Sequence, residues 1–287
     1  LPLQASFMLA VVAGGSIGLG ALYYTIVASD SSLSFAVVRV LGGLTFSLGL
    51  AIVLVGGAEL FTGNNLIVMA WASGTVSTWV MLRNWIIVWL GNFVGALGLA
   101  CLVFLSHHLD MNGGRIGLSV ANTAVAKIQP DFLTLFVKGI LCNLLVCMAV
   151  WLAYAGRSVT DKIVALILPV SAFIAAGFEH CVANMYFLPL AWLEARTGSL
   201  PADFDASSIT LMGIVHNLVP VTLGNIVGGA VLVGGVYWFI YRAAFGGSRI
   251  GVLDPVVDHP VRRDRAHLRR DRHHAADVLR AALEQRV

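Results

Sequence analysis

Charged side chains are scarce in this chain of 287 residues, making up 11% of it, whereas they make up about 25% of an ordinary soluble domain. Hydrophobic residues account for 58%, and the mean hydropathy is +0.86. One core could not bury this much apolar surface at this length. The composition therefore excludes a soluble globular domain.

Motifs that carry catalytic chemistry are also scarce. The sequence has no H-E-x-x-H zinc motif and no phosphate-binding loop, which are signatures of large enzyme classes. Cysteine is rare as well, without a C-x-x-C pair or a zinc-like spacing among Cys101, Cys142, Cys147 and Cys181. We therefore expect no enzyme, no metal site and no cofactor.

Long apolar runs dominate what is present, and most of them reach the roughly 20 residues that a helix needs to cross a bilayer. They predict six transmembrane helices, with the second and fifth broken and followed by short apolar pieces. The expected helices cover residues 6–28, 35–57, 84–105, 132–155, 162–178 and 209–241, and the short pieces cover 65–73 and 185–193. The predicted fold class is an all-α, multi-pass membrane protein.

The composition changes abruptly after Arg242, because ten of the 18 Lys and Arg residues lie in 242–287. We expect a transmembrane domain at 1–243 and a basic, solvated tail at 244–287. An even number of spans puts both ends of the chain on one side, and the positive-inside rule places them in the cytoplasm. The expected location is the inner (plasma) membrane, with the tail meeting water or anionic membrane lipid and no nucleic acid. No positively charged leader precedes the first apolar run, so we expect that run to stay in the membrane.

Two short motifs occur twice and in the same order. GAELFTGN at 57–64 shares Gly, Glu and Asn with GFEHCVAN at 177–184, and GNFVG at 91–95 matches GNIVG at 224–228. Each half then holds three spans, and an odd number inverts the second half in the membrane. Broken helices are tolerated only where protein or water surrounds them, so the breaks mark the pathway. We expect non-helical segments near 57–65 and 177–187 that approach each other.

Four segments carry a resemblance to a known family: GAELFTGNN at 57–65, LCNLLVC at 141–147, GFEHCVANM at 177–185 and PVTLGN at 220–225. Together they resemble the formate/nitrite transporter family over about residues 5–243. The resemblance implies an aquaporin-like protomer in a homopentamer with one pore per subunit. It also implies a channel that passes formate, nitrite or a related weak-acid anion, with 1–243 as the channel domain.

Residue by residue, the resemblance makes His180 the central pore histidine and Thr62 its partner in the first break. It makes Lys127 an anion-attracting lysine, and Asn143 and Asn225 polar pore-lining groups. The apolar constrictions above and below the histidine would be formed by Phe46, Leu50, Leu60, Phe61 and Phe173.

Each of these residues also has a plainer interpretation. His180 could be a satisfied core histidine, although an intramembrane ionisable group points by default to function. Thr62 could bond its own backbone, and Lys127, near the outer end of the fourth predicted helix, could reach for the interface, as could Lys138.

The buried carboxylates Glu59 and Glu179 invite a role as proton carriers. We expect them to be structural, with Asn64 and Asn184, because a carboxylate beside a helix break can accept hydrogen bonds from the freed backbone N–H groups. In the last helix, His216 and Asn217 have no repeat partner in the matched motifs and are interpreted as packing groups.

Solvation suggests a mechanism, because an anion in hydrocarbon costs several kcal/mol or more unless it is paired or neutralised. Protons are therefore expected partners, since a histidine titrates near neutral pH and could protonate a weak acid between two apolar gates. A hydrosulfide channel of the same family remains open. A neutral-solute channel is disfavoured because neither break carries an Asn-Pro-Ala signature, and a membrane-embedded enzyme is disfavoured by the scarcity of catalytic motifs.

Overall fold

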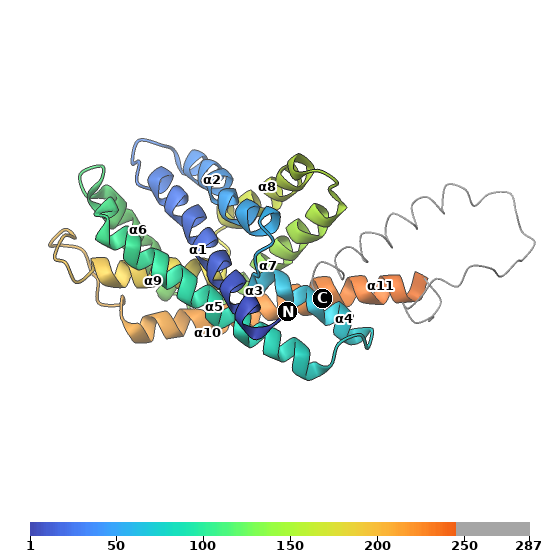
Figure 1. Cartoon of the computed structure of the whole chain (residues 1–287). Coiled ribbons are helices and arrows are strands. Elements are labelled where there is room, and N and C mark those ends of the chain that lie inside the picture. Colours follow the sequence, from blue (N-terminus) through green and yellow to red (C-terminus); the bar gives the residue numbers. More distant parts are fainter. Residues whose placement is uncertain (245–287) are drawn as a thin grey trace, which may run out of the picture.

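The computed structural model describes residues 1–244, which form α-helices with short 3₁₀ and π segments and no strand (Figure 1). Within this range five helical segments are long and apolar enough to cross a membrane. They are α1 (Leu3–Ala28), α2 (Phe35–Val55), α5 (Thr78–Leu105), α7 (Phe132–Ala155) and the continuous segment Leu211–Arg242. The predicted tail lies, apart from Ala244, outside the described residues.

Polar caps define where several of these helices begin. The side chain of Ser34 accepts a hydrogen bond from the third residue of α2, and Ser77 does the same for α5. At the start of α7 the Asp131 carboxylate accepts the Thr134 N–H at 2.7 Å, and this bond lowers the pKa of Asp131. Such caps satisfy backbone N–H groups that have no partner within the helix.

The second and fifth predicted helices are broken, as expected. The second consists of α2, α3 (Phe61–Asn64), a 3₁₀ turn (Asn65–Ile67) and α4 (Val68–Ala72), and the fifth consists of α8 (Val159–Ala175) and α9 (Cys181–Glu194). The breaks are shorter than predicted, because helix resumes at Phe61 and at Cys181.

One helix was not predicted: α6 (Arg115–Ile128), which follows a 3₁₀ turn (His108–Asp110). Only one face of α6 is buried, and small residues form much of that face, including Gly117, Ala121 and Ala124. A scan for long apolar runs passes over such a helix, because polar residues alternate with short apolar ones.

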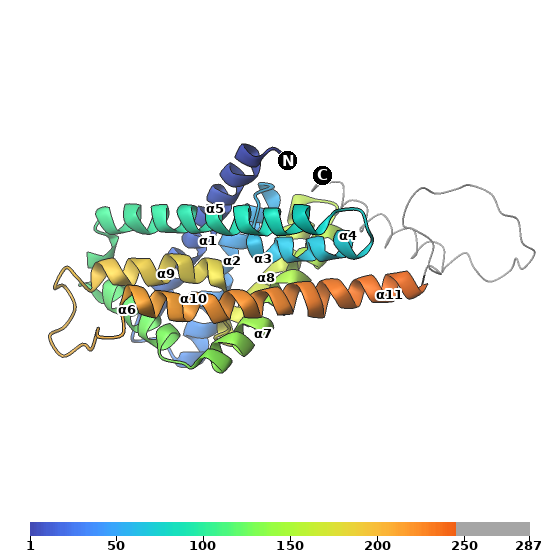
Figure 2. The ribbon, with the colours of Figure 1, turned by 90° about the horizontal axis from the view of Figure 1, so that it is seen from below.

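The last helix is not uniform. It begins with α10 (Leu211–Ile226), continues as a π-helix (Val227–Gly235) and ends in α11 (Val236–Ala244). In Figure 2 this rod and α5 run along the two long sides of the molecule, and α9 and the α3–α4 segment lie between them. The two short segments extend in opposite directions from the centre (Figure 2).

Glycines allow the long helices to pack backbone to backbone at matched positions of the two halves. A Cβ on Gly95 of α5 would lie 1.9 Å from the Val11 carbonyl oxygen of α1, and one on Gly228 would lie 2.2 Å from the Ile140 carbonyl oxygen of α7. Both distances are far inside van der Waals contact, so only glycine fits. Close approach of this kind through small residues is typical of membrane helices.

Candidate functional site

Each break turns on a glycine in the left-handed region, Gly57 with φ 69° and Gly177 with φ 72°. A side chain at these angles would be strained, whereas glycine adopts them without penalty. After each turn the chain is extended for a few residues, and then a short helix starts. These short helices are α3, whose N-cap residue is Leu60, and α9, whose N-cap residue is His180.

An asparagine from the following long helix holds the first break. The Asn92 Oδ1 accepts the Phe61 N–H at 2.9 Å, and its Nδ2 donates to the carbonyl oxygens of Glu59, at 2.9 Å, and Ala10, at 2.7 Å. Asn92 is fully buried. One side chain therefore satisfies backbone groups on both sides of the break, in a place where water could not.

Asn225 does the same for the second break. Its Oδ1 accepts the Cys181 N–H at 2.9 Å, and its Nδ2 donates to the carbonyl oxygens of Gly139, at 2.8 Å, and Glu179, at 3.0 Å. The polar atoms of Asn225 thus bond to backbone. The sequence suggested a pore-lining group here, and the observed contacts describe a backbone clamp.

The two buried carboxylates accept hydrogen bonds from side-chain amides. Asn64 Nδ2 donates to Glu59, and Asn184 Nδ2 donates to Glu179 at 2.6 Å. We expected freed backbone N–H groups as the donors, but those of Glu59 and Glu179 donate to carbonyl oxygens of α1 and α7, each at 3.3 Å. These two backbone N–H groups are satisfied by neighbouring helices, and the carboxylates accept hydrogen bonds from side chains.

A second pair of asparagines completes these clusters. Asn84 Oδ1 accepts from Asn64 Nδ2 at 2.9 Å, and Asn217 Oδ1 accepts from Asn184 Nδ2 at 2.7 Å. The sequence interpretation that Asn217 has no repeat partner is wrong, since Asn84 occupies the corresponding place. The signal was present in the sequence, because each lies eight residues before the asparagine of its G-N motif, at 84 and 92 and at 217 and 225.

The breaks meet through Thr62 and His180, whose Oγ1 and Nε2 atoms lie 3.1 Å apart. Both residues are buried, with His180 only 3% exposed. The other ring nitrogen, Nδ1, accepts the Ala183 N–H at 3.1 Å and caps α9. A nitrogen that accepts a hydrogen bond carries no proton, so the neutral ring holds its proton on Nε2, toward Thr62.

Apolar side chains surround this contact. The Phe173 ring stacks on the His180 ring with centroids 5.9 Å apart, and the Phe46 ring meets Phe173 edge-on at 5.8 Å. The five residues expected to form constrictions are all buried: Phe46, Leu50, Leu60, Phe61 and Phe173. The histidine therefore sits in a low-dielectric environment with the Thr62 hydroxyl beside it.

Asn143 of α7 links the break segments from another side. Its Nδ2 donates to the carbonyl oxygens of Thr62, at 3.2 Å, and of Asn225, at 2.7 Å. Cys147, one turn later, donates its thiol to the same Thr62 carbonyl oxygen at 3.3 Å. These contacts fix the backbone that carries the Thr62 hydroxyl.

Lys127 lies in the last turn of α6 and not, as the sequence suggested, at the end of the fourth apolar span. Its Nζ donates to both carboxylate oxygens of Glu179 at 3.1 and 3.2 Å, and it lies 5.7 Å from the centre of the Phe187 ring. The Lys127 side chain is 15% exposed and that of Glu179 is 5% exposed. This is a largely buried ion pair one residue from His180.

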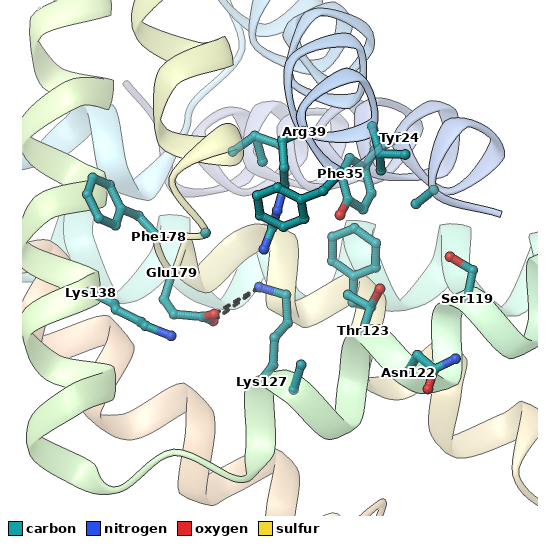
Figure 3. Close-up of a pocket in the computed structure, with 16 residues that line it drawn as sticks. Tyr24, Phe35, Arg39, Ser119, Asn122, Thr123, Lys127, Lys138, Phe178 and Glu179 are labelled. Carbon is teal, nitrogen blue, oxygen red and sulfur yellow. Dashed lines mark hydrogen bonds and ion pairs between the residues drawn. The ribbon is translucent and has the colours of Figure 1, made fainter. Parts of the chain in front are cut away.

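A cavity of about 420 Å³ opens beside this ion pair (Figure 3). Its walls come from α1, α2, α6, α7, α8, α9 and the second break, and they include Arg39 and Lys138 besides Lys127. Arg39 is not among the residues expected from the sequence, and Lys138 was expected to reach for the membrane interface. No sequence motif marks either residue, because the fold brings them together from separate helices.

One stretch of α1, Gly14-Gly15-Ser16-Ile17-Gly18, has the G-x-S-x-G spacing of a serine-hydrolase nucleophile. In those enzymes the serine stands on a sharp strand-to-helix turn. Here Ser16 is in the middle of an unbroken helix and donates its hydroxyl to the Val12 carbonyl oxygen at 2.8 Å. The match therefore has no catalytic setting. Among residues 1–244, no group of three or more His, Cys, Asp or Glu side chains could hold a metal ion.

Comparison with known proteins agrees with this arrangement. The family model for formate/nitrite transporters matches residues 1–239. The chain is 42% identical to the formate channel FocA of Haemophilus influenzae over 80% of this chain and 84% of that one, and 36% identical to the nitrite transporter NirC of Salmonella typhimurium over 79% and 80%. A solved structure of a pentameric formate channel with formate bound superposes with a TM-score of 0.76 at 42% identity, covering 83% of this chain and 97% of that one. The chain belongs to the formate/nitrite transporter family, a family of membrane channels and transporters.

Proposed function

We propose that this protein is a membrane channel for small monovalent weak-acid anions, most directly formate or nitrite. The observation that carries the proposal is the contact between Thr62 and His180 at the meeting point of the two breaks. It places a proton donor between apolar side chains in the interior of a membrane protein. Relatives named as formate channels and a nitrite transporter support the choice of substrate.

We infer an architecture of six spans in two inverted repeats, with the second and fifth spans broken, assembled as a homopentamer. The matched clamps of Asn92 and Asn225, and the opposite directions of the α3–α4 segment and α9, support the inverted repeat. A pentameric relative supports the assembly. The inner (plasma) membrane, cytoplasmic termini, a channel domain at 1–243 and a basic tail at 244–287 rest on the sequence pattern.

The proposed mechanism follows from solvation. An anion at the centre of the protein must replace its hydration, and the Nε2–H of neutral His180 and the Thr62 hydroxyl offer two hydrogen-bond donors at one point. The N-terminal end of α9 lies at the same point and adds a positive partial charge. Phe46, Phe173 and their apolar neighbours keep water from following.

Proton-linked passage requires more of His180. To give its Nε2 proton to the anion and remain neutral, the ring must take a second proton, which enters from the solution with the anion, at Nδ1, where the Ala183 N–H now donates. Losing that cap costs about 1 kcal/mol, and the charge of an approaching anion offsets the cost. A weak acid protonated in this way crosses as a neutral molecule, whereas a strong-acid anion cannot.

Lys127 is proposed to hand the anion on to His180 by a hydrogen bond, because its ammonium faces the cavity and is bonded to Glu179, the residue before His180. Asn143 and Asn225 are proposed to hold the pore backbone in place, with Glu59, Asn64, Glu179 and Asn184 as structural groups at the breaks. A hydrosulfide channel remains the alternative substrate class, since the same donors would serve that ion.

Uptake by the full chain in proteoliposomes tests the proposal. Formate and nitrite should enter these liposomes much faster than protein-free liposomes, whereas a strong-acid anion such as chloride should not. Hydrosulfide uptake measured in parallel decides between the substrate classes. If none of the weak acids enters faster than in protein-free liposomes, the proposed function is wrong.

A further inference from the structure

The cavity beside the ion pair carries an excess of positive charge. Arg39, Lys127 and Lys138 line it, and Glu179 is the carboxylate in its wall (Figure 3). In Figure 3 the charged ends of these four side chains are directed toward one another across a single space. A volume of about 420 Å³ leaves room there for a small anion with some of its water.

The three cations are not equivalent. The charge of Lys127 is balanced by Glu179, because both carboxylate oxygens lie within 3.2 Å of its Nζ. No carboxylate among residues 1–244 lies within ion-pair distance of Arg39 or Lys138. Seen from outside the cavity, the pair of Lys127 and Glu179 is close to neutral, and the net attraction for an anion comes from the other two cations.

Both of these residues lie against the second break. The Arg39 guanidinium lies over the Phe35 ring, 5.2 Å from its centre, and its nitrogens would be 3.6 and 3.8 Å from a Cβ placed on Gly177. On the opposite side, the Lys138 carbonyl oxygen accepts the Glu179 N–H at 3.3 Å. Arg39 on α2 and Lys138 on α7 therefore flank the chain segment that leads directly to His180.

We propose that Arg39 and Lys138 form an anion-loading site that binds a planar, two-oxygen anion before it reaches His180. This inference deepens the proposed function and rests on it. The guanidinium of arginine presents parallel N–H donors that match two oxygens in one plane. Formate and nitrite have that shape, whereas hydrosulfide and chloride each have a single acceptor atom. Arg39 is thus a specificity-determining residue, and Lys138 adds a second charge.

The test compares formate uptake by the full chain in proteoliposomes at ionic strengths of about 10 and about 150 mM, at which screening acts over roughly 30 and 8 Å. In the variant Arg39→Gln/Lys138→Gln, uptake at subsaturating formate should fall about tenfold at low ionic strength, and much less at high ionic strength. The saturating rate should change little. Arg157→Gln, which removes an exposed cation after α7, is the matched control and should behave as the parent.

A second arm tests the shape of the anion. Arg39→Lys keeps the charge but loses the parallel N–H donors of the guanidinium. The preference of this variant for formate over hydrosulfide should therefore fall several-fold, while the salt dependence of its uptake should stay unchanged. If variants with Arg39→Gln do not assemble, Lys138→Gln alone tests the loading site by the same measurement of salt-dependent uptake. The loading site would be overturned if Arg39→Gln/Lys138→Gln showed the same low-salt uptake and the same salt dependence as Arg157→Gln. The specificity role would be overturned if Arg39→Lys kept the parent's preference for formate over hydrosulfide. A parent that takes up no weak acid would instead refute the proposed function.

Discussion

Replacing Asn225 with Leu tests the clamp on the second break. Leucine has the same number and branching of side-chain heavy atoms, so the change removes hydrogen bonds without leaving a void. Three bonds disappear, those to Cys181 N–H and to the carbonyl oxygens of Gly139 and Glu179. The Gly139 carbonyl oxygen keeps its bond within α7, but the Cys181 N–H and the Glu179 carbonyl oxygen are left buried without a partner, at about 1 to 3 kcal/mol each. We therefore expect a loss of about 2 to 6 kcal/mol in the free energy of unfolding.

The assay is thermal unfolding of the purified protein in detergent, followed by light scattering and size-exclusion chromatography. About 3 kcal/mol corresponds to a fall in Tm of roughly 6 to 12 °C for a domain of this size. Asn92→Leu removes the same set of bonds at the first break and should lower Tm by a similar amount. A Tm for Asn225→Leu within about 2 °C of the parent, the shift expected from well under 1 kcal/mol, would refute the clamp.

Three further outcomes follow. Lys127→Ala leaves the Glu179 carboxylate buried without its cation and should destabilise the protein by about 3 to 5 kcal/mol. The double variant Lys127→Ala/Glu179→Gln should recover most of the lost Tm. Equal Tm values for the single and the double variant would show that the pair is not coupled. Thr62→Ser should retain formate uptake and Thr62→Val should lose about tenfold, equivalent to one hydrogen bond of about 1.4 kcal/mol; equal rates would remove the hydroxyl from the mechanism. Gly57→Ala and Gly177→Ala should each lower stability by about 1 to 2 kcal/mol, because both glycines have φ near 70°, and a neutral effect in thermal unfolding would contradict the strain.

The sequence was sufficient for the parts of the fold that depend on long apolar runs. Hydropathy located the broken second and fifth helices, and the repeat of Gly, Glu and Asn located the breaks to within a few residues. It also pointed to the approach of the two breaks, because breaks in matched helices must meet where backbone groups can be satisfied, and the family resemblance paired Thr62 with His180. The 3.1 Å contact confirms that approach.

The remainder depended on tertiary contacts that no local pattern encodes. α6 was not predicted because only one of its faces is buried and much of that face is small residues, and Lys127 was therefore placed on the wrong helix. The breaks were predicted too long because the clamping amides of Asn92 and Asn225, which let helix resume at once, come from distant helices. Arg39 has no neighbour in the sequence that would indicate a site.

The central claim is that His180 transfers a proton to the substrate, and the most direct test is the net charge moved per formate in the parent and in His180→Asn. Asparagine can still donate a hydrogen bond to the anion but cannot titrate. Membrane current and formate flux, measured together in proteoliposomes across a pH series, give the ratio. The account predicts nearly electroneutral, pH-dependent uptake in the parent, and electrogenic uptake with little pH dependence in His180→Asn. The same ratio and the same pH profile in both proteins would contradict it.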